Sequence, residues 1–446
     1  MHDSINRRNF LKQTGQIGLG LGLAGLTRWS SAAPRTVGPN DKLAVAVIGT
    51  NGRGLAHIDC LLGLPEAEIA YICDVDERAL AKGLKAAGKQ QRAPKGAKDF
   101  RTILEDKSVD AITIATPDHW HTPMALLALA AGKHVYVEKP CCQNPYEGEL
   151  LTQAVSNCKQ IVQMGNQRRS FPNMQEVIRD LHNGLIGKTY FARAWYTNHR
   201  GSIGHGHNAP VPSWLDYDLW QGPAPRRPYR SNLIHYNWHW FWHWGTGEAL
   251  NNGTHEVDVC RWALGVDWPI RVSSNGGRYA FQDDWETPDT QVIGWDYAEG
   301  KTISWEGRSC NGYPVEGLER GSLIYGTQGV ALLDGNNYTI FDNHKKKVKE
   351  VKGNSKADPT NTVSASGLDL DRLHVKNFLD CVRTGQQPNS PISEGNKSVT
   401  MLHLGNISWR VSRELHLDPA NGHIQDDADA MKLWRREYEP GWEPKA

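Results

Sequence analysis

The sequence lacks an excess of charge of either sign. Its 446 residues carry 50 Lys and Arg against 49 Asp and Glu, so no strong field would attract nucleic acid or a charged membrane surface. The one notable basic run, His344–Lys347, lies between two short alternating stretches and predicts a solvated hairpin. We therefore expect no nucleic-acid partner.

The sequence also lacks paired cysteine motifs. Its eight cysteines contain no Cys-x-x-Cys and show no regular spacing, so neither a disulfide scaffold nor a cysteine metal site is predicted. Cys60 and Cys73 fall in a predicted helix and a predicted buried strand, which is typical of small core side chains.

Histidine pairs do not predict a metal site either. The His-x-His motif at residues 205–207 and the pair His239 and His243 have no carboxylate or cysteine at ligand spacing. We therefore predict no metal site.

The N-terminal apolar run is too short to span a membrane. Ile17–Leu26 is about half the length that a spanning helix needs. It follows an arginine pair at residues 7–8 and precedes Ser-Ala-Ala at residues 31–33, a pattern typical of a twin-arginine signal peptide. We expect residues 1–33 to be removed on export, leaving a periplasmic or otherwise extracytoplasmic protein without stable membrane insertion. The alternative is an ordinary secretory or anchor sequence with a chance arginine pair.

A glycine-rich turn follows the first predicted strand of the mature chain. Leu43–Ile48 is a continuous apolar run, and a helical pattern extends from Leu55 to Leu62. A turn between a strand and a helix N-terminus offers backbone N–H groups to a pyrophosphate. Asn replaces the usual middle glycine, and it tolerates a left-handed backbone better than most residues. The cofactor-binding candidates in this turn are Gly49, Asn51, Gly52, Arg53 and Gly54.

An acidic residue ends the second predicted strand, Ala67–Cys73. Asp74 lies about 20 residues after Gly54, where a carboxylate accepts hydrogen bonds from the adenosine ribose hydroxyls. Such a carboxylate repels a 2'-phosphate, which favours NAD over NADP. Arg78 keeps NADP as the less favoured alternative.

Two further strand ends carry polar residues. Val109–Ala115 leads into Thr-Pro-Asp-His-Trp-His at residues 116–121, and His134–Val137 leads into Glu-Lys-Pro at residues 138–140. Strands alternate with helices through residues 41–165, which predicts a doubly wound parallel sheet of the Rossmann type. In such sheets the ligand lies at the carboxyl ends of the strands, where both motifs fall.

The second half of the chain has a different pattern. Helical signals (Asn173–Leu185, a helix starting near Glu248, Asp369–Thr384 and Glu394–Glu414) flank a long aromatic-rich segment that ends near Trp244. Several stretches alternate as half-buried strands do, which predicts an α+β domain, residues 166–446, with a large and mostly antiparallel open sheet. These stretches are Lys188–Tyr196, Val272–Tyr279, Thr290–Asp296, Thr302–Trp305, Ser322–Tyr325 and Tyr338–Phe341.

From Leu43 through Asp380 the chain resembles the Gfo/Idh/MocA superfamily of glucose-fructose oxidoreductase and inositol dehydrogenase, as an exported subgroup. The glycine turn, the acidic strand end, Thr-Pro and above all Glu-Lys-Pro at 138–140 carry the resemblance. It implies an NAD(H)-dependent oxidoreductase, a carbohydrate or polyol substrate and a homo-oligomer. It also implies that Lys139 lies beside the nicotinamide and the substrate hydroxyl. The cofactor-lining residues that it implies are Thr116, Pro117, His121, Glu138, Lys139 and Asn166.

The resemblance also points to an acid–base pair at a helix start. In the family an Asp and a His four residues apart face the substrate, and here Asn251 and His255 occupy those places. A histidine can take the hydroxyl proton as hydride leaves. Because the amide of Asn251 cannot take a proton, we expect Lys139, Glu248 or a loop histidine to share the acid–base work.

The aromatic-rich segment supplies candidate substrate contacts. Trp faces and imidazole donors suit a sugar-binding wall, while packing between domains or subunits is the alternative. The substrate-binding candidates are His199, His205, His207, Trp238, His239 and Trp242.

Export bears on the reaction, because free NAD is scarce outside the cytoplasm. A cofactor loaded before export has to stay bound and be returned to its starting state in each cycle. The first hypothesis is therefore an NAD(H)-dependent sugar or polyol oxidoreductase with a tightly bound, internally recycled cofactor. The second is a redox-neutral glycoside hydrolase or lyase that oxidises, eliminates, adds water and reduces again. The third is a non-catalytic exported sugar or nucleotide binder.

Overall fold

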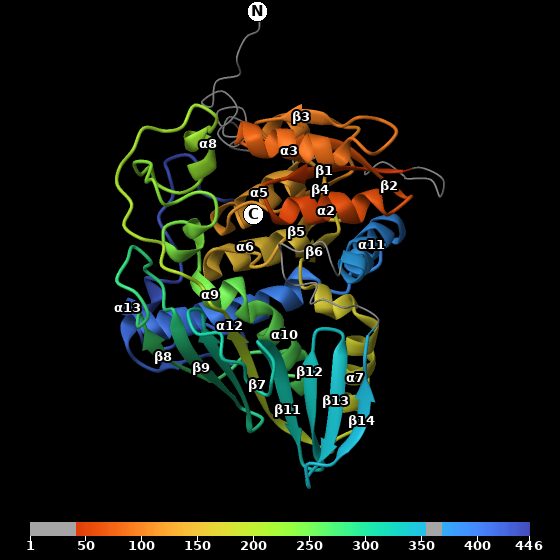
Figure 1. Cartoon of the computed structure of the whole chain (residues 1–446), viewed down its shortest axis with the longest axis vertical. Coiled ribbons are helices and arrows are strands. Elements are labelled where there is room, and N and C mark those ends of the chain that lie inside the picture. The colour runs from red at the N-terminus through yellow and green to blue at the C-terminus, as the bar shows by residue number, and fades with distance from the viewer. Residues whose placement is uncertain (1–41, 354–367) are drawn as a thin grey trace, which may run out of the picture.

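The computed structural model describes residues 42–353 and 368–446. The predicted signal peptide, residues 1–33, lies outside the described residues. The chain forms two halves, each a sheet with its own helices, and the two halves are packed against one another (Figure 1). The N-terminal sheet occupies the upper part of that view and the C-terminal sheet the lower part.

The N-terminal sheet confirms the predicted doubly wound parallel sheet. Its strand order is β3-β2-β1-β4-β5-β6, and every neighbouring pair is parallel. The order reverses between β1 and β4, where such sheets bind their ligand. The strands are β1 Leu43–Ile48, β2 Ala67–Cys73, β3 Lys95–Ala97, β4 Ala111–Ile114, β5 His134–Val137 and β6 Val162–Met164. The helices and 3-10 turns of this half are α2 Arg53–Leu62, α3 Glu77–Ala87, α4 Arg101–Leu104, η1 Asp118–Trp120, α5 His121–Ala130, α6 Pro145–Ser156 and η2 Gln167–Ser170.

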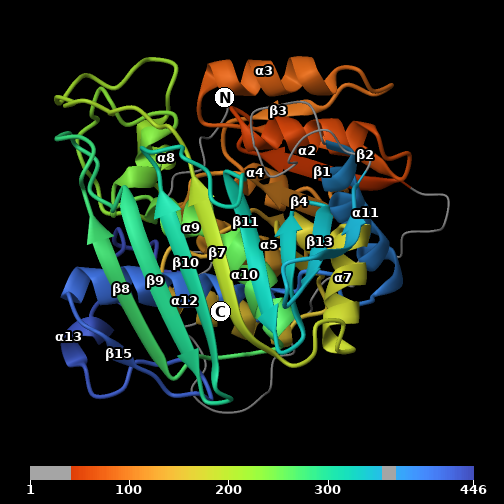
Figure 2. The ribbon, with the colours of Figure 1, turned by 60° about the horizontal axis from the view of Figure 1, so that its bottom comes forward.

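The C-terminal sheet confirms the predicted large, mostly antiparallel sheet. Nine strands lie in the order β14-β13-β12-β11-β7-β10-β9-β8-β15, and the β7–β10 pair is parallel while the other neighbouring pairs are antiparallel. Figure 2 shows the sheet in front, with α10 and α12 behind it. The strands are β7 Thr189–Thr197, β8 Arg271–Gly277, β9 Thr290–Tyr297, β10 Lys301–Arg308, β11 Arg320–Gly326, β12 Gly329–Asp334, β13 Asn337–Asp342, β14 Lys347–Val351 and β15 Leu415–His416.

Side-chain alternation explains how this sheet packs. On β10, Ile303 and Trp305 are buried while Ser304 and Glu306 are half-buried on the other face, as expected for a sheet covered on one side. Trp295 of β9 is fully buried and donates to the carbonyl of Met401 at 2.9 Å. The helices and 3-10 turns of this half are α7 Pro172–His182, α8 Tyr217–Gln221, η3 Asn237–Trp240, α9 Gly247–Asn251, α10 Gly253–Leu264, α11 Leu368–Thr384, α12 Ile392–Val411 and α13 Ala428–Met431.

Local features of the C-terminal half differ from the sequence prediction. The helix expected near Glu248 is two helices, α9 and α10, separated at Asn252. Strand β12 had no counterpart in the prediction, although its side chains alternate between buried and half-buried positions. The basic run at His344–Lys347 does lie at the exposed turn between β13 and β14, as expected.

The aromatic-rich segment folds against the N-terminal half. We call residues 198–246 the strap; Figure 1 shows it running along the side of both sheets. Its contacts with the loop after β2 include two backbone hydrogen bonds: Glu77 N donates to the carbonyl of Trp214 at 2.9 Å, and Asp216 N donates to the carbonyl of Val75 at 3.1 Å. The strap has a core of its own, which includes Trp220, Leu233, Trp238, Phe241 and Trp244.

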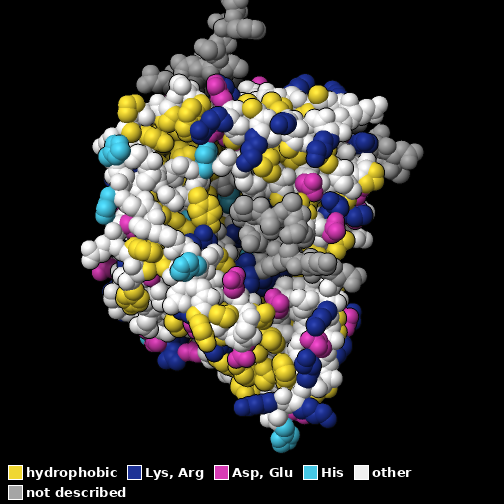
Figure 3. Space-filling view, viewed as in Figure 1, with side chains coloured by type: hydrophobic (Ala, Val, Ile, Leu, Met, Phe, Trp, Pro, Cys, Tyr) yellow, Lys and Arg dark blue, Asp and Glu magenta, His cyan; other side chains and the backbone are white. Residues whose placement is uncertain are grey.

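The described surface carries both signs of charge, as Figure 3 shows for one face. All eight cysteines are free, and Cys60 and Cys73 are buried as predicted. Among the described residues no helix is long and apolar enough to cross a membrane. Within the same ranges no three His, Cys, Asp or Glu side chains are placed to hold a metal ion.

Candidate active site

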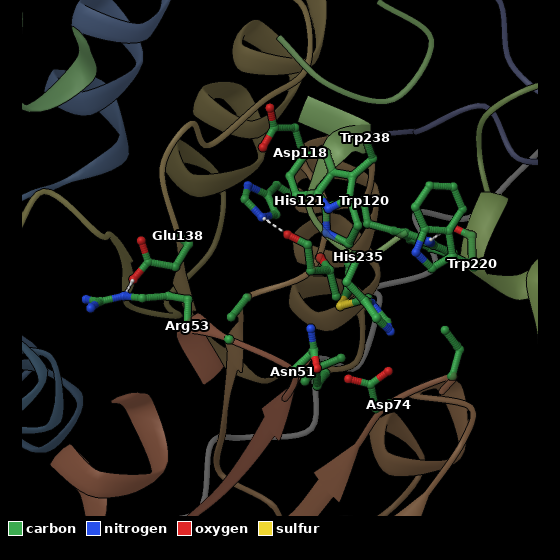
Figure 4. Close-up of a pocket in the computed structure, with 18 of the residues that line it drawn as sticks. Asn51, Arg53, Asp74, Asp118, Trp120, His121, Glu138, Trp220, His235 and Trp238 are labelled. Atoms are coloured by element: carbon green, nitrogen blue, oxygen red, sulfur yellow. Dashed lines mark hydrogen bonds and ion pairs between the residues drawn. The ribbon is translucent and has the colours of Figure 1, made fainter. Parts of the chain in front are cut away.

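A pocket of ≈ 250 Å³ lies at the carboxyl ends of β1, β2, β4 and β5, with the strap on its other side (Figure 4). The structure brings thirteen of the predicted site residues to its wall: Gly49, Asn51, Gly52, Arg53, Asp74, Thr116, Pro117, His121, Glu138, Lys139, Trp238, His239 and Asn251.

The glycine turn is built for close backbone approach. Gly49 has φ +85°, and a Cβ there would lie 2.5 Å from the carbonyl oxygen of Ala115. A Cβ on Gly54, which is buried behind the wall, would lie 1.9 Å from the carbonyl oxygen of Gly49. A Cβ on Gly52 would meet nothing within 4 Å, and no side chain caps the N-terminus of α2 there. This open helix N-terminus fits a pyrophosphate.

Asp74 is held in place by the backbone. Its Oδ2 accepts from Thr50 N at 2.7 Å and its Oδ1 accepts from Asp76 N at 3.0 Å. Burial raises the pKa of this carboxyl, while those backbone hydrogen bonds oppose the shift. Arg78 is engaged elsewhere, since it pairs with Asp76 at 2.9 Å and lies 3.3 Å from the ring centroid of Trp214.

Arg53 and Glu138 bind one another rather than standing free in the pocket (Figure 4). Arg53 Nε donates to Glu138 Oε1 at 2.7 Å, and its NH1 pairs with Asp371 at 2.5 Å. His57 Nε2 contacts the same Glu138 oxygen at 2.9 Å. Burial opposes ionisation, yet Arg53 and His57 hold the pKa of Glu138 well below its usual value. These charges therefore fix the loop that carries Lys139.

Three side chains near this loop fit a nucleotide cofactor. His121 bridges two carbonyls, those of Thr116 at 2.8 Å and Pro140 at 2.6 Å. Thr116 Oγ1 and both amide atoms of Asn166 are buried with no hydrogen-bond partner in the part of the chain that the structure describes. Buried polar atoms require partners, so a polar ligand group fits beside Thr116; Asn166, although predicted to line the cofactor, is not part of the pocket wall.

Lys139 is joined to Asn251 across the pocket. Its Nζ donates to the main-chain carbonyl of Asn251 at 2.5 Å and lies 3.5 Å from the Oδ1 of the same residue. That carbonyl is available because α9 ends at Asn251, and the last carbonyls of a helix have no intrahelical partner. Burial lowers the pKa of Lys139, with Glu138 and Asp118 opposing the shift. Its ammonium is therefore poised to release a proton more easily than a surface lysine.

Glu248 lies behind Asn251 and does not reach the pocket wall. Its carboxylate accepts from Asn251 Nδ2 at 3.2 Å, from Arg200 Nε at 2.8 Å and from Ser309 Oγ at 3.0 Å, and also from Asn252. The Asn251 amide nitrogen is thus turned toward Glu248, which leaves its oxygen facing Lys139. Sequence reasoning missed Arg200 and Ser309, because only the fold brings the strap and β10 to this helix.

His255 is buried near Lys139 but is not part of the pocket wall. Its Nδ1 has no hydrogen-bond partner among the described residues. Burial lowers the pKa of His255 well below its usual value, and the nearby positive charges of Lys139 and Arg320 lower it further. Asn251 and His255, which were expected on one helix, belong to two helices, because α9 ends at Asn251 and α10 begins at Gly253.

The strap contributes Tyr236, Trp238 and His239 to the pocket. His239 stacks on Trp238 with ring centroids 3.6 Å apart, and its Nδ1 lies 2.6 Å from the carbonyl oxygen of Tyr236. Burial lowers the pKa of His239 to about 3. Tyr236 was missed by sequence reasoning; its hydroxyl lies 3.5 Å from Asn251 Nδ2. No motif distinguishes it from the other aromatic residues of the strap.

Four of the predicted substrate contacts lie outside this pocket. His199 and His207 are exposed, and His205 pairs with Asp284 at 3.1 Å in a solvent-facing part of the strap. Trp242 lines a second cavity on the other side of the strap. The strap turns back on itself, which the sequence pattern gives no means to foresee.

The fold and this pocket define a two-domain protein whose first domain is of the Rossmann type, with the pocket at the carboxyl ends of its parallel strands. Residues 43–166 match the family model described as "Oxidoreductase family, NAD-binding Rossmann fold", and residues 181–443 match "Oxidoreductase family, C-terminal alpha/beta domain". The chain belongs to the Gfo/Idh/MocA oxidoreductase family.

Curated relatives match part of the chain. A "Glycosyl hydrolase family 109 protein" of Saccharopolyspora erythraea is 32% identical over 255 residues, covering 48% of this chain and 55% of that protein. An "Alpha-N-acetylgalactosaminidase" of Shewanella oneidensis is 28% identical over 246 residues, covering 49% and 51%. The chain thus spans about half the length of the curated relatives that it matches.

Solved structures share the fold. An oxidoreductase domain protein from Kribbella flavida superposes with a TM-score of 0.66 at 19% identity, covering 84% of this chain and 99% of that one. A levoglucosan dehydrogenase in complex with NADH and levoglucosan superposes with a TM-score of 0.65 at 18% identity, with the same coverage.

Proposed function

We propose that this protein is an NAD(H)-dependent enzyme that oxidises a hydroxyl of a carbohydrate and keeps its cofactor bound through the cycle. The observation that carries the proposal is the Lys139–Asn251 contact, which holds a half-buried, proton-releasing amine in the pocket that the glycine turn also lines. A non-catalytic binder has no use for such an amine at this place.

The adenosine end of the pocket supports NAD rather than NADP. Asp74 presents a carboxylate where a 2'-phosphate would lie. Arg78, the candidate that the sequence offers for holding that phosphate, is engaged by Asp76 and Trp214, and Lys98 of the pocket wall pairs with Glu77.

The strap supports retention of the cofactor. Leu219, Trp220, His235, Tyr236 and Trp238 close the pocket opposite the glycine turn. The strap is also tied to the loop after β2 by backbone hydrogen bonds and by the contact of His235 with Asp76 at 2.5 Å. A dinucleotide beneath it can leave only when these contacts open.

The acid–base chemistry follows from the charges around Lys139. NAD held in this pocket would supply a reversible hydride acceptor for a sugar carbon. Lys139, in its neutral form, takes the proton of the hydroxyl that is being oxidised. Asn251 orients that hydroxyl through its Oδ1, and Glu248 holds the amide in the required direction.

A second candidate is redox-neutral glycoside cleavage, as the names of the curated relatives favour. Oxidation at a ring carbon acidifies the C–H bond next to it, and loss of that proton expels the glycosidic oxygen as an alcohol. Water then adds to the alkene, the carbon regains a proton, and the hydride returns to the carbonyl. This reaction also needs a second base, which removes the proton from the carbon next to the oxidised one. Tyr236, whose hydroxyl lies beside Asn251, is the candidate for this base.

We further propose export by the twin-arginine route, a periplasmic or extracytoplasmic location and a homo-oligomer. The N-terminal pattern supports the first two. The open face of the nine-stranded sheet supports the third. The N-terminal sequence of the purified protein tests cleavage of the signal peptide, its presence in the periplasmic or cytoplasmic fraction tests the location, and its native mass tests the homo-oligomer.

The deciding experiment is to denature purified, never-dialysed protein and quantify the nucleotide released, with its redox state. About one NAD or NADH per chain supports the captive cofactor. An empty protein that binds NAD only weakly contradicts it. Nitrophenyl glycosides in deuterium oxide then separate the two candidates: cleavage with deuterium incorporated into the sugar ring supports the redox-neutral reaction, while oxidised sugar without cleavage supports the dehydrogenase.

A further inference from the structure

A second cavity, of ≈ 370 Å³, lies on the far side of the strap and shares no wall residue with the cofactor pocket. It is formed by the strap, the start of α6, the end of α12 and the segment after α13. Figure 1 shows α6, α9, α12 and α13 lying together in this part of the molecule. Residues 238–239 of the strap face the first pocket and residues 242–243 face the second, so the strap is the wall between them.

The charge of this cavity is one-sided. Arg226, Arg227, Arg410, Arg435 and Arg436 line it, against a single lining carboxylate, that of Glu437. The chain as a whole is nearly balanced, with 50 basic and 49 acidic residues. Such a grouping of guanidinium groups is therefore a local feature of this cavity and not a consequence of composition.

Most of these arginines are not neutralised by neighbours. Within residues 42–353 and 368–446, Arg227, Arg410 and Arg435 make no ion pair; they lie over the aromatic rings of Trp244, Trp242 and Tyr146. Ring contacts orient a guanidinium but leave its N–H groups free to bind an anion.

The remaining two arginines are held by the protein and frame the site. Arg226 donates to the carbonyls of Gly222 at 2.8 Å and Ala224 at 3.0 Å. Arg436 pairs with the buried Glu147 at 2.9 Å, while its NH1 is buried without a hydrogen-bond partner among the described residues. An unpaired buried guanidinium N–H requires an acceptor, and an oxyanion in the cavity would supply one.

We propose that this cavity is a binding site for a small oxyanion, a carboxylate or sulfate group, carried by a ligand that contacts Trp242. Guanidinium groups recognise such planar or tetrahedral oxyanions by paired N–H donors. The amide nitrogens of Gln143 and Asn406 on the same wall already donate to the carbonyls of Trp242 and Thr246, so the arginines supply the contacts with the anion. Because the strap separates the two cavities, the site is distinct from the place where Lys139 acts.

The test is calorimetric titration of the full protein with three probes: inorganic sulfate, glucuronate and neutral glucose. The expected result is binding of sulfate or glucuronate with a Kd of about 1 mM or below, weakening as salt is raised, and no comparable binding of glucose. Sulfate binding alone identifies a site for the inorganic ion, and glucuronate binding identifies a site for an organic acid. The proposal is overturned if neither sulfate nor glucuronate binds, or if glucose binds as well as glucuronate while sulfate does not.

Variants locate the site. Arg410→Gln and Arg227→Gln change exposed side chains, so both variants are expected to fold, and each is expected to weaken oxyanion binding about tenfold or more. The matched control is Arg413→Gln, since Arg413 pairs with Asp427 outside the cavity, and its affinity is expected to stay unchanged. A second control, Lys139→Met, must also retain binding. The proposal is wrong if Lys139→Met abolishes oxyanion binding. It is also wrong if Arg413→Gln weakens that binding as much as Arg410→Gln does.

Discussion

The ammonium group of Lys139 donates to the main-chain carbonyl of Asn251 at 2.5 Å. This contact joins the loop after β5 in one domain to the end of α9 in the other. It depends on backbone rather than on side-chain identity, because the carbonyl is freed by the break between α9 and α10. The asparagine that replaces the acidic residue expected from the family therefore leaves this anchor of Lys139 intact.

Replacing Lys139 with methionine is expected to remove turnover while leaving the cofactor in place. A positioned general base contributes roughly 10²- to 10⁴-fold to rate, and methionine keeps the volume without the proton transfer. Turnover and nucleotide content after denaturation are measured on the same sample. Loss of both together contradicts the assigned role, since it would make Lys139 a cofactor anchor.

The pH dependence of oxidation is expected to follow the same amine. Burial lowers the pKa of Lys139 below its ordinary value of 10.5, and the neutral form is the base. The oxidation rate should therefore rise with pH through a pKa below 10.5 and level off above it. The measurement is the rate of single-turnover oxidation as a function of pH. The control is the residual rate of the Lys139→Met variant, which should not rise with pH in this way.

Asn251→Asp is expected to destabilise the protein at neutral pH. The Asn251 amide nitrogen donates to Glu248 at 3.2 Å, and an aspartate would set a second carboxylate against the first. We expect about 1–3 kcal/mol lower unfolding free energy at pH 7, because two close carboxylates cannot both ionise freely. The loss should shrink toward pH 5, where one of them takes a proton. Urea unfolding of both proteins at both pH values measures this, and equal stability at pH 7 would show that the amide contact is unimportant.

The Rossmann half could be predicted closely from sequence because each of its signals is local. β1, β2 and β5 begin and end where the apolar runs of the sequence do. Thr116, Lys139 and Gly52 reach the same pocket because the carboxyl ends of parallel strands meet at one edge.

The strap could not be predicted, because its conformation is set by contacts with distant parts of the chain. His205 and Trp242 have the same residue types as His239 and Trp238, yet only the latter two reach the pocket. Long-range packing decides this, and no periodicity encodes it. The break between α9 and α10 at Asn252 could not be predicted either, because the helical pattern of the sequence continues through it.

Two glycines of the turn are expected to respond differently to alanine. At Gly49, φ is +85° and a Cβ would lie 2.5 Å from the carbonyl oxygen of Ala115, so Gly49→Ala should lower the Tm. At Gly52 a Cβ would meet nothing within 4 Å, so Gly52→Ala should keep the Tm of the nucleotide-free protein while lowering its affinity for NAD. Thermal unfolding and NAD titration of both variants test the pair. Unchanged NAD affinity in Gly52→Ala would contradict the assignment of this turn to the pyrophosphate.

His235→Ala is expected to speed the release of the cofactor. His235 joins the strap to Asp76, which is buried and also holds Arg78, so the substitution loosens the strap while leaving α3 capped. We expect release about tenfold faster, measured by transfer of NAD from the protein to an excess of an NAD-consuming enzyme. His207→Ala, at an exposed position of the same strap, is the matched control. Equal rates in the two variants would show that the strap does not retain the cofactor.

His134 provides a test of acid sensitivity away from the site. Burial lowers its pKa to about 4, and its Nδ1 accepts from Ile161 N at 2.9 Å, so the folded state keeps the ring neutral. The unfolded chain binds more protons between pH 4 and 6.5, so stability is lost as pH falls through that window, by about 2 kcal/mol from pH 7 to pH 5 for this residue. His134→Asn keeps an acceptor near the Nδ1 position and removes the titration, so its unfolding free energy should fall less steeply with acid. Urea unfolding at pH 7 and pH 5 measures the difference, with His344→Asn at the exposed β13–β14 turn as the control that should match the parent. A parallel acid dependence in His134→Asn and the parent would mean that other groups control the loss of stability.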